Sequence, residues 1–326
     1  MTSSRVAITG ATGYLGSVLS DRFSSRGDEV VALTRRRPER GVSEWRHFEL
    51  GRPVDPTIFH GVDALVHGAW VLSGKDTSQL WRENVIGSRR LIEAAVTAGV
   101  HKVVFVSSMS AYFGTRQTYG LMKLAVERSA LDLGCVVVRP GLVYGESPGG
   151  MAGTLRKISR LPLWPNFESA KLFLAHEDDV AQAIARIVDH HDELAGEVLG
   201  LANPQSVDLP SILTGLSPEH TRRLTLPVPA TLVMAVLRLL ERADVPFPFR
   251  SDSLLGLTES ADVLPGQERL AQQGVEFRTL DGSFEARVSA RTVSLFIPSP
   301  AAEGTHSSSG NFVDSMQRGR EPGGQL

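Results

Sequence analysis

Three glycines spaced three residues apart, Gly10, Gly13 and Gly16, most constrain the fold of this chain. They follow a short apolar and β-branched segment, residues 6–9, and a helical pattern of apolar residues begins directly after them. Glycine can adopt the positive φ of a tight turn, and without a Cβ it allows close backbone approach. A strand, a glycine turn and a helix in this order are typical of a dinucleotide-binding unit, whose helix N-terminus faces a pyrophosphate. A glycine triplet alone is a weak signal, so the rest of the chain must support it.

Segments of strand and helix character alternate through the first half of the chain. This alternation predicts an α/β fold with a doubly wound parallel sheet, a Rossmann sheet, covered on both faces by helices. Its ligand crevice is expected beyond the C-terminal ends of the strands. The predicted strands cover 6–9, 30–33, a short segment ending near Glu49-Leu50, 63–67, 102–106 and 135–139, and the predicted helices include about 78–98 and 119–132.

The regular alternation stops after Pro140, where proline and glycine become frequent. We therefore predict an NADP-binding Rossmann domain over residues 1–144, with returning elements near 171–201. A smaller C-terminal, mainly substrate-binding domain is predicted over 145–288. Residues 289–326 are rich in Ser, Gly, Pro and charge and lack periodicity, which predicts a disordered tail.

Composition excludes several classes of partner. The formal net charge is −2 over 326 residues, so there is no electrostatic argument for a nucleic-acid partner. The single cysteine, Cys135, lies in an apolar run and excludes an intramolecular disulfide. No spaced cluster of His, Cys and carboxylate residues indicates a metal site.

The most apolar segment, residues 229–240, is too short to be an integral membrane segment and contains Arg238. Its apolar side chains at helical spacing predict a helix packed on the body of the protein, with a peripheral membrane helix as the alternative. The polar N-terminus shows no signal peptide, so we expect a cytoplasmic protein.

The residues after the second strand bear on the choice of nicotinamide cofactor. An acidic residue there would bind the adenosine ribose hydroxyls of NAD. This chain instead has Thr34-Arg35-Arg36-Arg37, and guanidinium groups are well shaped to bind a 2′-phosphate. We therefore predict NADP(H), with NAD(H) less favoured, and Arg35 and then Arg36 as the binding residues. The alternative is a solvated surface charge run.

A possible reaction centre follows the fifth strand. That strand ends in Ser107-Ser108, and Tyr119 and Lys123 then lie four residues apart on a predicted helix, hence on one face. A phenol is a poor acid or base at neutral pH, and a neighbouring ammonium is expected to lower its pKa. A serine hydroxyl at the strand end can hold a substrate oxygen while a proton and a hydride are transferred.

In these motifs the chain resembles the extended short-chain dehydrogenase/reductase family, which contains nucleotide-sugar epimerases, dehydratases and ketoreductases. The resemblance covers nearly all of residues 5–285. It rests on Thr9-Gly10-x-x-Gly13-x-x-Gly16, His67-Gly68-Ala69, Asn84-Val85-x-Gly87, Ser107-Ser108, Tyr119-x-x-x-Lys123, Arg139-Pro140-Gly141-x-Val143-Tyr144-Gly145 and His176-x-Asp178-Asp179.

The resemblance implies roles for individual residues. Tyr119 would be the acid/base, Lys123 would lower its pKa and contact the nicotinamide ribose, and Ser108 would orient the substrate oxygen. Asn84 would support the long helix and a proton-relay water. The implied cofactor-binding residues are Gly10, Thr12, Gly13, Tyr14, Leu15, Gly16, Arg35, Arg36, Glu49, Leu50, Gly68, Ala69, Lys123, Pro140, Gly141 and Val143.

The chain departs from the family pattern in three places. Counting back from Gly114 puts Met109 in the place of the catalytic serine, whereas the strand register favours Ser108, with Ser110 as the alternative. The interval from serine to tyrosine is shorter than usual, which predicts a more open substrate mouth. Glu49-Leu50 is only an approximate match to the usual Asp-Leu.

These features predict an NADP(H)-dependent oxidoreductase for a secondary alcohol or ketone, with a nucleotide-sugar 4-ketoreductase or epimerase favoured. A reductase of non-sugar ketones remains open, as does an NADP-binding sensor or assembly protein without turnover. The expected partners are a small-molecule substrate and a second copy of the chain in a homodimer, and no nucleic acid is expected.

Overall fold

The computed structural model describes most of the chain up to residue 280. The described residues are 3–72, 76–146, 148–167, 170–217, 223–243, 245, 249–259 and 261–280. The predicted tail, 289–326, lies outside the described residues.

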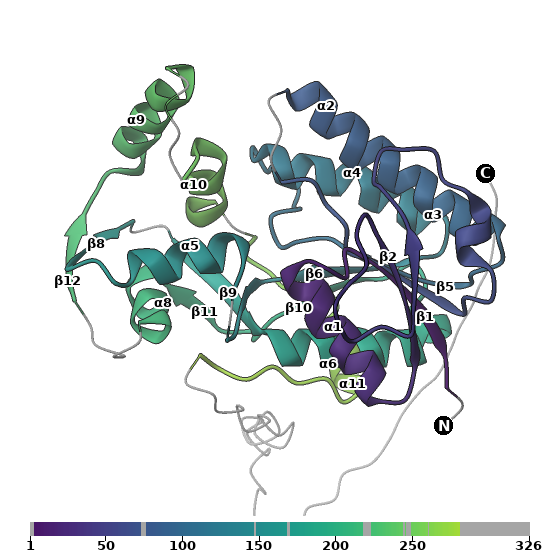
Figure 1. The fold of residues 1–326 in the computed structure, drawn as a ribbon. Coiled ribbons are helices and arrows are strands. Elements are labelled where there is room, and N and C mark those ends of the chain that lie inside the picture. Colours follow the sequence, from purple (N-terminus) through teal and green to yellow (C-terminus); the bar gives the residue numbers. More distant parts are fainter. Residues whose placement is uncertain are drawn as a thin grey trace, which may run out of the picture. The chain divides into compact units, whose positions relative to one another are not determined.

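The centre of the fold is a seven-stranded parallel sheet (Figure 1). Its strand order, β10-β6-β5-β4-β1-β2-β3, reverses direction between β1 and β4, as in a doubly wound sheet. This confirms the predicted fold class, and the returning segment near 197–201 supplies the strand beside β6. The strands are β1 (Arg5–Thr9), β2 (Glu29–Thr34), β3 (Glu44–His47), β4 (Ala64–His67), β5 (Lys102–Val106), β6 (Val136–Pro140) and β10 (Val198–Leu201).

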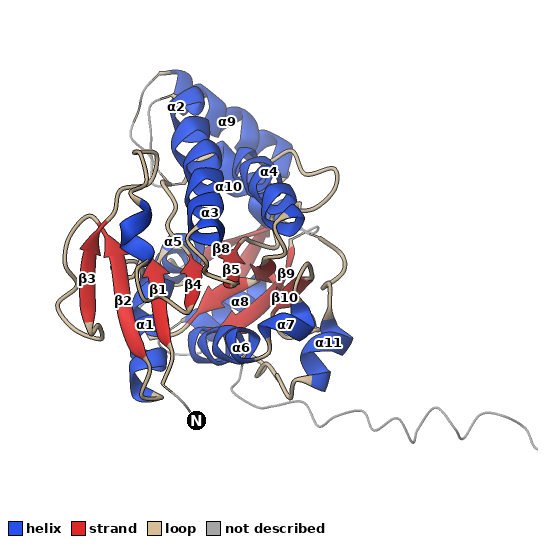
Figure 2. Cartoon of the chain, turned by 90° about the vertical axis from the view of Figure 1, so that its right-hand side faces the viewer, coloured by secondary structure: helices blue, strands red, loops and turns tan. Residues whose placement is uncertain are grey.

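Helices cover both faces of this sheet (Figure 2). Helices α1 (Tyr14–Ser25) and α6 (Glu177–Asp189) pack on one face, and α3 (Gly87–Thr97) and α4 (Thr118–Asp132) on the other. Because successive side chains of a strand point to opposite faces, each strand contributes alternately to two apolar cores. In β1, for example, Ile8 belongs to the first core and Ala7 to the second.

The long helix predicted over 78–98 is present but not uniform. It begins as α2 (Thr77–Trp81), continues as a π-helical turn over Arg82–Ile86 and ends as α3. π-Helical turns are rare and often occur at functional sites. This one contains Asn84.

The second part of the chain has its own apolar core, centred on the fully buried Trp164. Its elements are β7 (Leu142–Tyr144), α5 (Gly150–Ile158), β8 (Leu163–Asn166), β9 (Lys171–His176), β11 (Ser206–Asp208), α8 (Leu209–Leu216), β12 (Leu224–Pro227), α9 (Ala230–Arg242) and α10 (Ser251–Thr258). Three short segments elsewhere complete the described fold: a 3-10 turn at Pro56–Phe59, α7 (His191–Leu194) and α11 (Gln267–Gln272). Both parts belong to one compact unit, so the predicted boundary at 144/145 remains a prediction.

Two sequence predictions are wrong in detail. Strand β3 ends at His47 rather than near Glu49-Leu50, because Phe48 turns into the core and a tight turn with Gly51 at φ 88° follows. Helix α9 packs on the third core with one face only, where Leu237 is buried, whereas Leu232 and Leu239 on its other face are exposed. None of the described helices has the length and apolar character needed to cross a bilayer.

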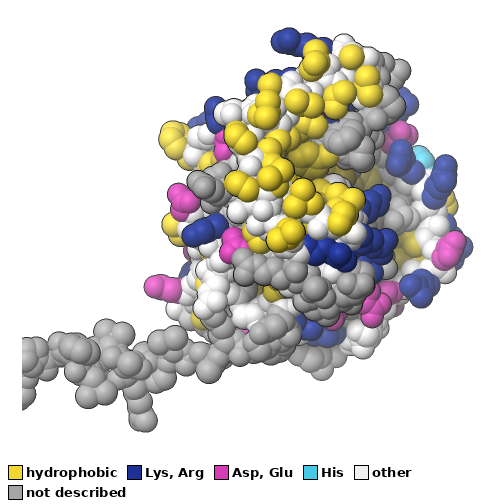
Figure 3. Space-filling view, turned by 90° about the vertical axis from the view of Figure 1, so that its left-hand side faces the viewer, with side chains coloured by type: hydrophobic (Ala, Val, Ile, Leu, Met, Phe, Trp, Pro, Cys, Tyr) yellow, Lys and Arg dark blue, Asp and Glu magenta, His cyan; other side chains and the backbone are white. Residues whose placement is uncertain are grey.

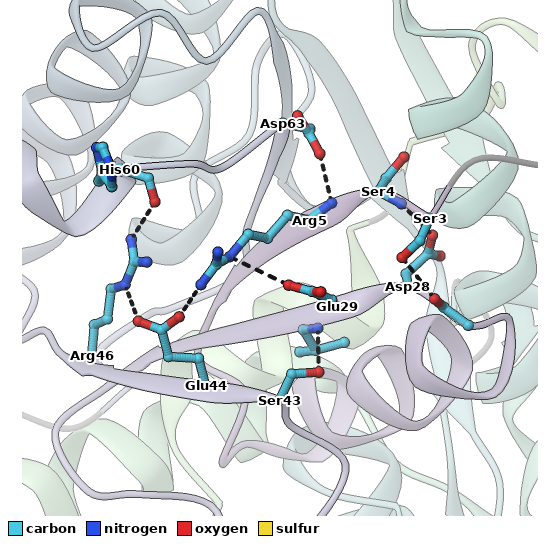
Figure 4. Close-up of polar contacts among 12 residues, drawn as sticks. Ser3, Ser4, Arg5, Asp28, Glu29, Ser43, Glu44, Arg46, His60 and Asp63 are labelled. Atoms are coloured by element: carbon cyan, nitrogen blue, oxygen red, sulfur yellow. Dashed lines mark hydrogen bonds and ion pairs between the residues drawn. The ribbon is translucent and has the colours of Figure 1, made fainter.

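Ion pairs gather at the amino edge of the central sheet, opposite the expected crevice (Figure 4). The Glu44 carboxylate accepts hydrogen bonds from Arg46 Nε at 2.7 Å and from Arg5, and these contacts hold its pKa below the usual range. The Arg5 backbone N–H donates to Asp63 at 2.7 Å. These contacts join the amino ends of β1, β3 and β4. The polar network therefore occupies the amino edge of the sheet and not the carboxyl edge, where the ligand crevice is expected.

Candidate active site

The glycine turn between β1 and α1 has the geometry of a phosphate loop. Gly10 has φ 75°, and its carbonyl accepts a hydrogen bond from Gly13 N at 2.8 Å. A Cβ on Gly16 would lie 2.0 Å from the Gly10 carbonyl oxygen, so only glycine allows α1 to start this close to the turn. Gly13 caps α1 without a side chain, which leaves the first-turn N–H groups, including those of Leu15 and Gly16, for an anion.

The residues around this turn fit a bound dinucleotide. Thr12 and Gly13 are exposed, while Leu15 packs on the first core. The Tyr14 side chain lies against Gly149, and burial together with the Glu177 carboxylate raises its pKa. The expected contribution of Tyr14 to cofactor binding is therefore its backbone N–H at the helix start.

The ends of β1 and β4 are joined by one hydroxyl group. The Thr9 hydroxyl accepts hydrogen bonds from Gly68 N and Ala69 N, each at 3.1 Å, and lies 2.7 Å from His67 Nδ1. Burial, reinforced by the nearby Lys123, lowers the pKa of His67 to about 3. The imidazole is therefore neutral and shapes the backbone of Gly68 and Ala69 rather than taking part in acid/base chemistry.

The arginines predicted to select NADP lie where β2 ends. Arg35, Arg36 and Arg37 are all exposed, and none takes part in an ion pair among the described residues. The Arg36 carbonyl accepts a hydrogen bond from the Thr34 hydroxyl at 2.7 Å, which fixes the turn. The guanidinium groups are therefore available to an anionic ligand at this strand end.

The other predicted cofactor residues fall into two groups. Glu49 and Leu50 lie beyond the end of β3, where Leu50 packs on the second core and close to Gly87. Pro140 ends β6 and accepts a hydrogen bond from Met109 N at 3.0 Å. A Cβ on Gly141 would lie 2.3 Å from the Phe173 carbonyl oxygen, so glycine is required there, and Val143 packs in the first core.

The structure brings Ser108 and Tyr119 together at the carboxyl edge of the sheet. Burial raises the pKa of Tyr119 to about 12, and the neighbouring Ser108 side chain opposes this shift. Ser110 N donates to the Ser108 hydroxyl at 3.1 Å, and Met109 lies in the first core. Of the three residues weighed for the serine position, Ser108 is the one whose side chain affects the Tyr119 phenol, and its role as the catalytic serine stays a prediction.

Lys123 is buried beneath aromatic rings. Its ammonium group donates to the Val106 carbonyl at 2.7 Å and lies 3.7 Å from the centre of the Trp70 ring and 4.9 Å from that of Phe105. Desolvation lowers the pKa of Lys123 to about 7, although the Glu127 carboxylate opposes the shift. Trp70 also meets the Tyr119 ring edge to face at 5.9 Å.

This arrangement differs from the sequence expectation. The ammonium of Lys123 was expected to lower the pKa of Tyr119, yet it lies 5.7 Å from the tyrosine ring centre, and burial dominates both groups. With these pKa values the Tyr119 phenol is protonated at neutral pH, and Lys123 is partly protonated. Trp70, which the sequence suggests as a residue of the substrate mouth or the core, is the neighbour of both, and its place directly after His67-Gly68-Ala69 puts it at the crevice edge.

A buried polar cluster supports the site from behind. Glu127 is one helical turn beyond Lys123 and pairs with Arg139, whose Nη2 and Nε donate at 2.6 and 2.9 Å. The Ser107 hydroxyl donates to the same carboxylate. The cluster therefore ties α4 to the ends of β5 and β6, the two strands whose ends carry Ser108 and Pro140. Sequence analysis missed it, although the i, i+4 spacing from Lys123 was visible.

Asn84 positions the loop that carries Trp70. Its side-chain amide accepts from Val71 N at 2.8 Å and donates to the Val71 carbonyl at 2.9 Å, and it is 1% exposed. These contacts hold the loop through both ends of the amide, and the implied role of Asn84 in a proton relay stays a prediction. No group of metal-ligating residues occurs among the described residues.

A parallel doubly wound sheet with a glycine turn after β1, and with serine, tyrosine and lysine at its carboxyl edge, defines a short-chain dehydrogenase/reductase of the extended class. Comparison with known families agrees. The NAD dependent epimerase/dehydratase family matches residues 6–202, and the chain belongs to this family.

Individual relatives vary in what they act on. The chain is 30% identical over 187 residues to a ceramide reductase of Caulobacter vibrioides, covering 54% of this chain and 58% of that protein. It is 32% identical over 173 residues to a dTDP-6-deoxy-L-talose 4-dehydrogenase (NAD(P)(+)) of Kitasatospora kifunensis, covering 45% and 54%. The matches thus span just over half the length of these curated relatives.

Solved structures agree on the fold. MoeE5 in complex with UDP-glucose and NAD superimposes with a TM-score of 0.63 at 21% identity, covering 86% of this chain and 96% of that one. At this identity the similarity concerns the fold alone.

Proposed function

We propose that this protein is an NADP(H)-dependent oxidoreductase that transfers a hydride between nicotinamide and a secondary alcohol or ketone. The observation that carries the proposal is the contact of Ser108 with Tyr119, one helical turn from Lys123, at the carboxyl edge beside the glycine turn. Nicotinamide, when bound, supplies or accepts the hydride. The glycine turn and the N-terminus of α1 would hold its pyrophosphate.

The protonation states favour reduction. A Tyr119 phenol with a pKa of about 12 is protonated at neutral pH and can donate its proton to a carbonyl oxygen. Ser108 would hold that oxygen by a second hydrogen bond. The carbonyl carbon gains the hydride, the oxygen gains the phenol proton, and solvent returns a proton to Tyr119.

Replacing the phenol tests the mechanism. Tyr119→Phe should lower hydride transfer about 100-fold or more, as expected when general acid catalysis is lost, while cofactor affinity is retained. Tyr112→Phe, on the preceding loop, is the control and should keep full turnover. Turnover of Tyr119→Phe equal to that of the unaltered protein would exclude this mechanism, whereas cofactor binding by the unaltered protein without any turnover would favour an NADP-binding sensor or assembly protein.

The preference for NADP rests on Arg35 and Arg36. Their exposed guanidinium groups at the end of β2 would pair with the 2′-phosphate, and no acidic residue stands in the run 35–37. Arg35→Ala should weaken NADPH binding by at least about tenfold and leave NADH nearly unchanged, measured by titration of cofactor fluorescence. Arg40→Ala, also exposed, is the control, and equal losses for both cofactors would contradict the preference.

For the substrate, a nucleotide sugar is the first candidate, either reduced at a 4-keto group or epimerised. The support is the similarity to the dTDP-6-deoxy-L-talose 4-dehydrogenase. The ceramide reductase similarity favours a non-sugar ketone instead. A cofactor-oxidation screen over keto-sugar nucleotides, small ketones and a long-chain keto-lipid separates the two.

A further inference from the structure

One side of the second part of the chain exposes an unusual number of large apolar side chains. We name it the leucine face, and it is made of Leu163, Leu224, Leu226, Leu232, Val236 and Leu239. Each is at least 46% exposed, and Leu224 reaches 80%. Single exposed apolar residues are common on protein surfaces, but a contiguous set indicates an interaction site.

The leucine face follows from the local geometry. Strands β8 and β12 pair in parallel with Leu163 opposite Leu224, and Leu226 lies two residues on, so all three project from one face of this small sheet. The opposite face is filled by the buried Trp164. Two residues after β12, helix α9 begins and continues the surface with a stripe at i, i+4 and i+7, namely Leu232, Val236 and Leu239.

The charge around the leucine face is mainly positive. The described segments 148–167 and 223–243 contain six basic residues and one acidic residue, Glu241, although the whole chain has slightly more acidic than basic residues. The Glu241 carboxylate accepts a hydrogen bond from the Ser251 hydroxyl at the start of α10. Figure 3 views this side, where Lys and Arg side chains lie next to the gathered hydrophobic ones. The basic residues are Arg156, Lys157, Arg160, Arg223, Arg238 and Arg242.

We propose that the leucine face is a membrane-docking surface that binds the headgroup region of an anionic lipid bilayer. Apolar side chains inserting between headgroups, with basic residues pairing with anionic lipids, are the two attractions that hold interfacial helices on membranes. A second copy of the chain would place like-charged rims together across a two-fold axis, so the charge pattern favours lipid over self-association. The proposal does not depend on the reaction catalysed.

Vesicle co-sedimentation of the full chain tests this proposal. The protein should sediment with vesicles of phosphatidylcholine and phosphatidylglycerol and bind far less to pure phosphatidylcholine. Raising the salt concentration should weaken binding, because salt screens the attraction between the basic residues and the anionic lipid headgroups. The triple variant Leu224→Ser, Leu226→Ser and Leu232→Ser should lose at least about tenfold in partition coefficient, because its insertable apolar area is smaller.

Two controls separate docking from general effects. Val263→Ser removes a side chain that is 73% exposed outside the leucine face and should bind vesicles like the unaltered chain. Thermal unfolding of the triple variant should match that of the unaltered chain, since the replaced side chains are exposed. Equal binding to neutral and anionic vesicles, or undiminished binding of the triple variant, would overturn the proposal. So would a dimer that dissociates in the triple variant without any vesicle binding.

Discussion

Replacing Lys123 by methionine should make the protein more stable and should lower turnover, because the family resemblance gives Lys123 a contact with the nicotinamide ribose. The ammonium is 3% exposed, and burial lowers its pKa from 10.5 to about 7. At about 1.4 kcal/mol per pKa unit, charging this side chain costs about 5 kcal/mol more in the folded than in the unfolded chain. Methionine has a similar length and contacts aromatic rings favourably through its sulfur, so Trp70 and Phe105 keep a partner.

The expected gain follows from two opposing contributions. Lys123→Met removes the cost of burying a charge but leaves the Val106 carbonyl without its donor, at a cost of about 1–3 kcal/mol. Below pH 7, where folded Lys123 carries the charge, the variant should therefore be more stable by about 2–4 kcal/mol. This agrees with the gain of about 1–4 kcal/mol seen when buried charges are replaced by apolar residues.

The pH dependence gives the sharper measurement. Between the folded pKa of about 7 and the unfolded value of 10.5, the unfolded chain binds more protons than the folded one, so stability rises with pH. From pH 7.5 to 9.5 Lys123 should add about 2 kcal/mol to the free energy of unfolding. Lys123→Met should lack this contribution, whereas the exposed control Lys157→Met should retain it.

Urea denaturation of the three proteins at several pH values measures the difference directly. Between pH 7.5 and 9.5 the folded chain keeps His67 neutral and Cys135 and Tyr119 protonated, with or without the charge of Lys123, so comparing slopes isolates Lys123. If the free energy of unfolding of Lys123→Met rises with pH as steeply as that of the unaltered chain, the Lys123 ammonium is not buried. Turnover assays in parallel should show activity lowered in Lys123→Met alone.

Two further predictions concern the glycine turn and the buried cluster. Gly16→Ala should reduce cofactor affinity far more than Gly13→Ala, because the added Cβ lies 2.0 Å from the Gly10 carbonyl oxygen in one case and 3.1 Å in the other. Isothermal titration measures both, and equal losses would contradict the close packing of α1. Glu127→Gln should destabilise the fold by about 3 kcal/mol in urea denaturation, because it leaves Arg139 without its buried counterion. Glu193→Gln, which removes the exposed partner of His190, is the control and should lower the free energy of unfolding by less than about 1 kcal/mol. A similar loss for both variants would show that the Glu127–Arg139 cluster is not buried in solution.

The sequence by itself determined the sheet and the chemical groups of the site. Period-2 apolar strands and the glycine spacing are local signals, so β1, α1 and the alternation that follows could be predicted. The i, i+4 spacing placed Tyr119 and Lys123 on one face of α4 for the same reason. Counting from the end of β5 likewise selected Ser108, whose side chain neighbours Tyr119 and whose catalytic role stays a prediction.

Only the tertiary structure decided what surrounds those groups. The loop after β4 brings Trp70 over Lys123, and the pKa values of Lys123 and Tyr119 then follow from burial rather than from their mutual attraction. In α9 the apolar pattern is compatible with either face being buried, and long-range packing leaves Leu232 and Leu239 exposed. Periodicity shows which residues share a face, but desolvation depends on contacts between segments far apart in the sequence.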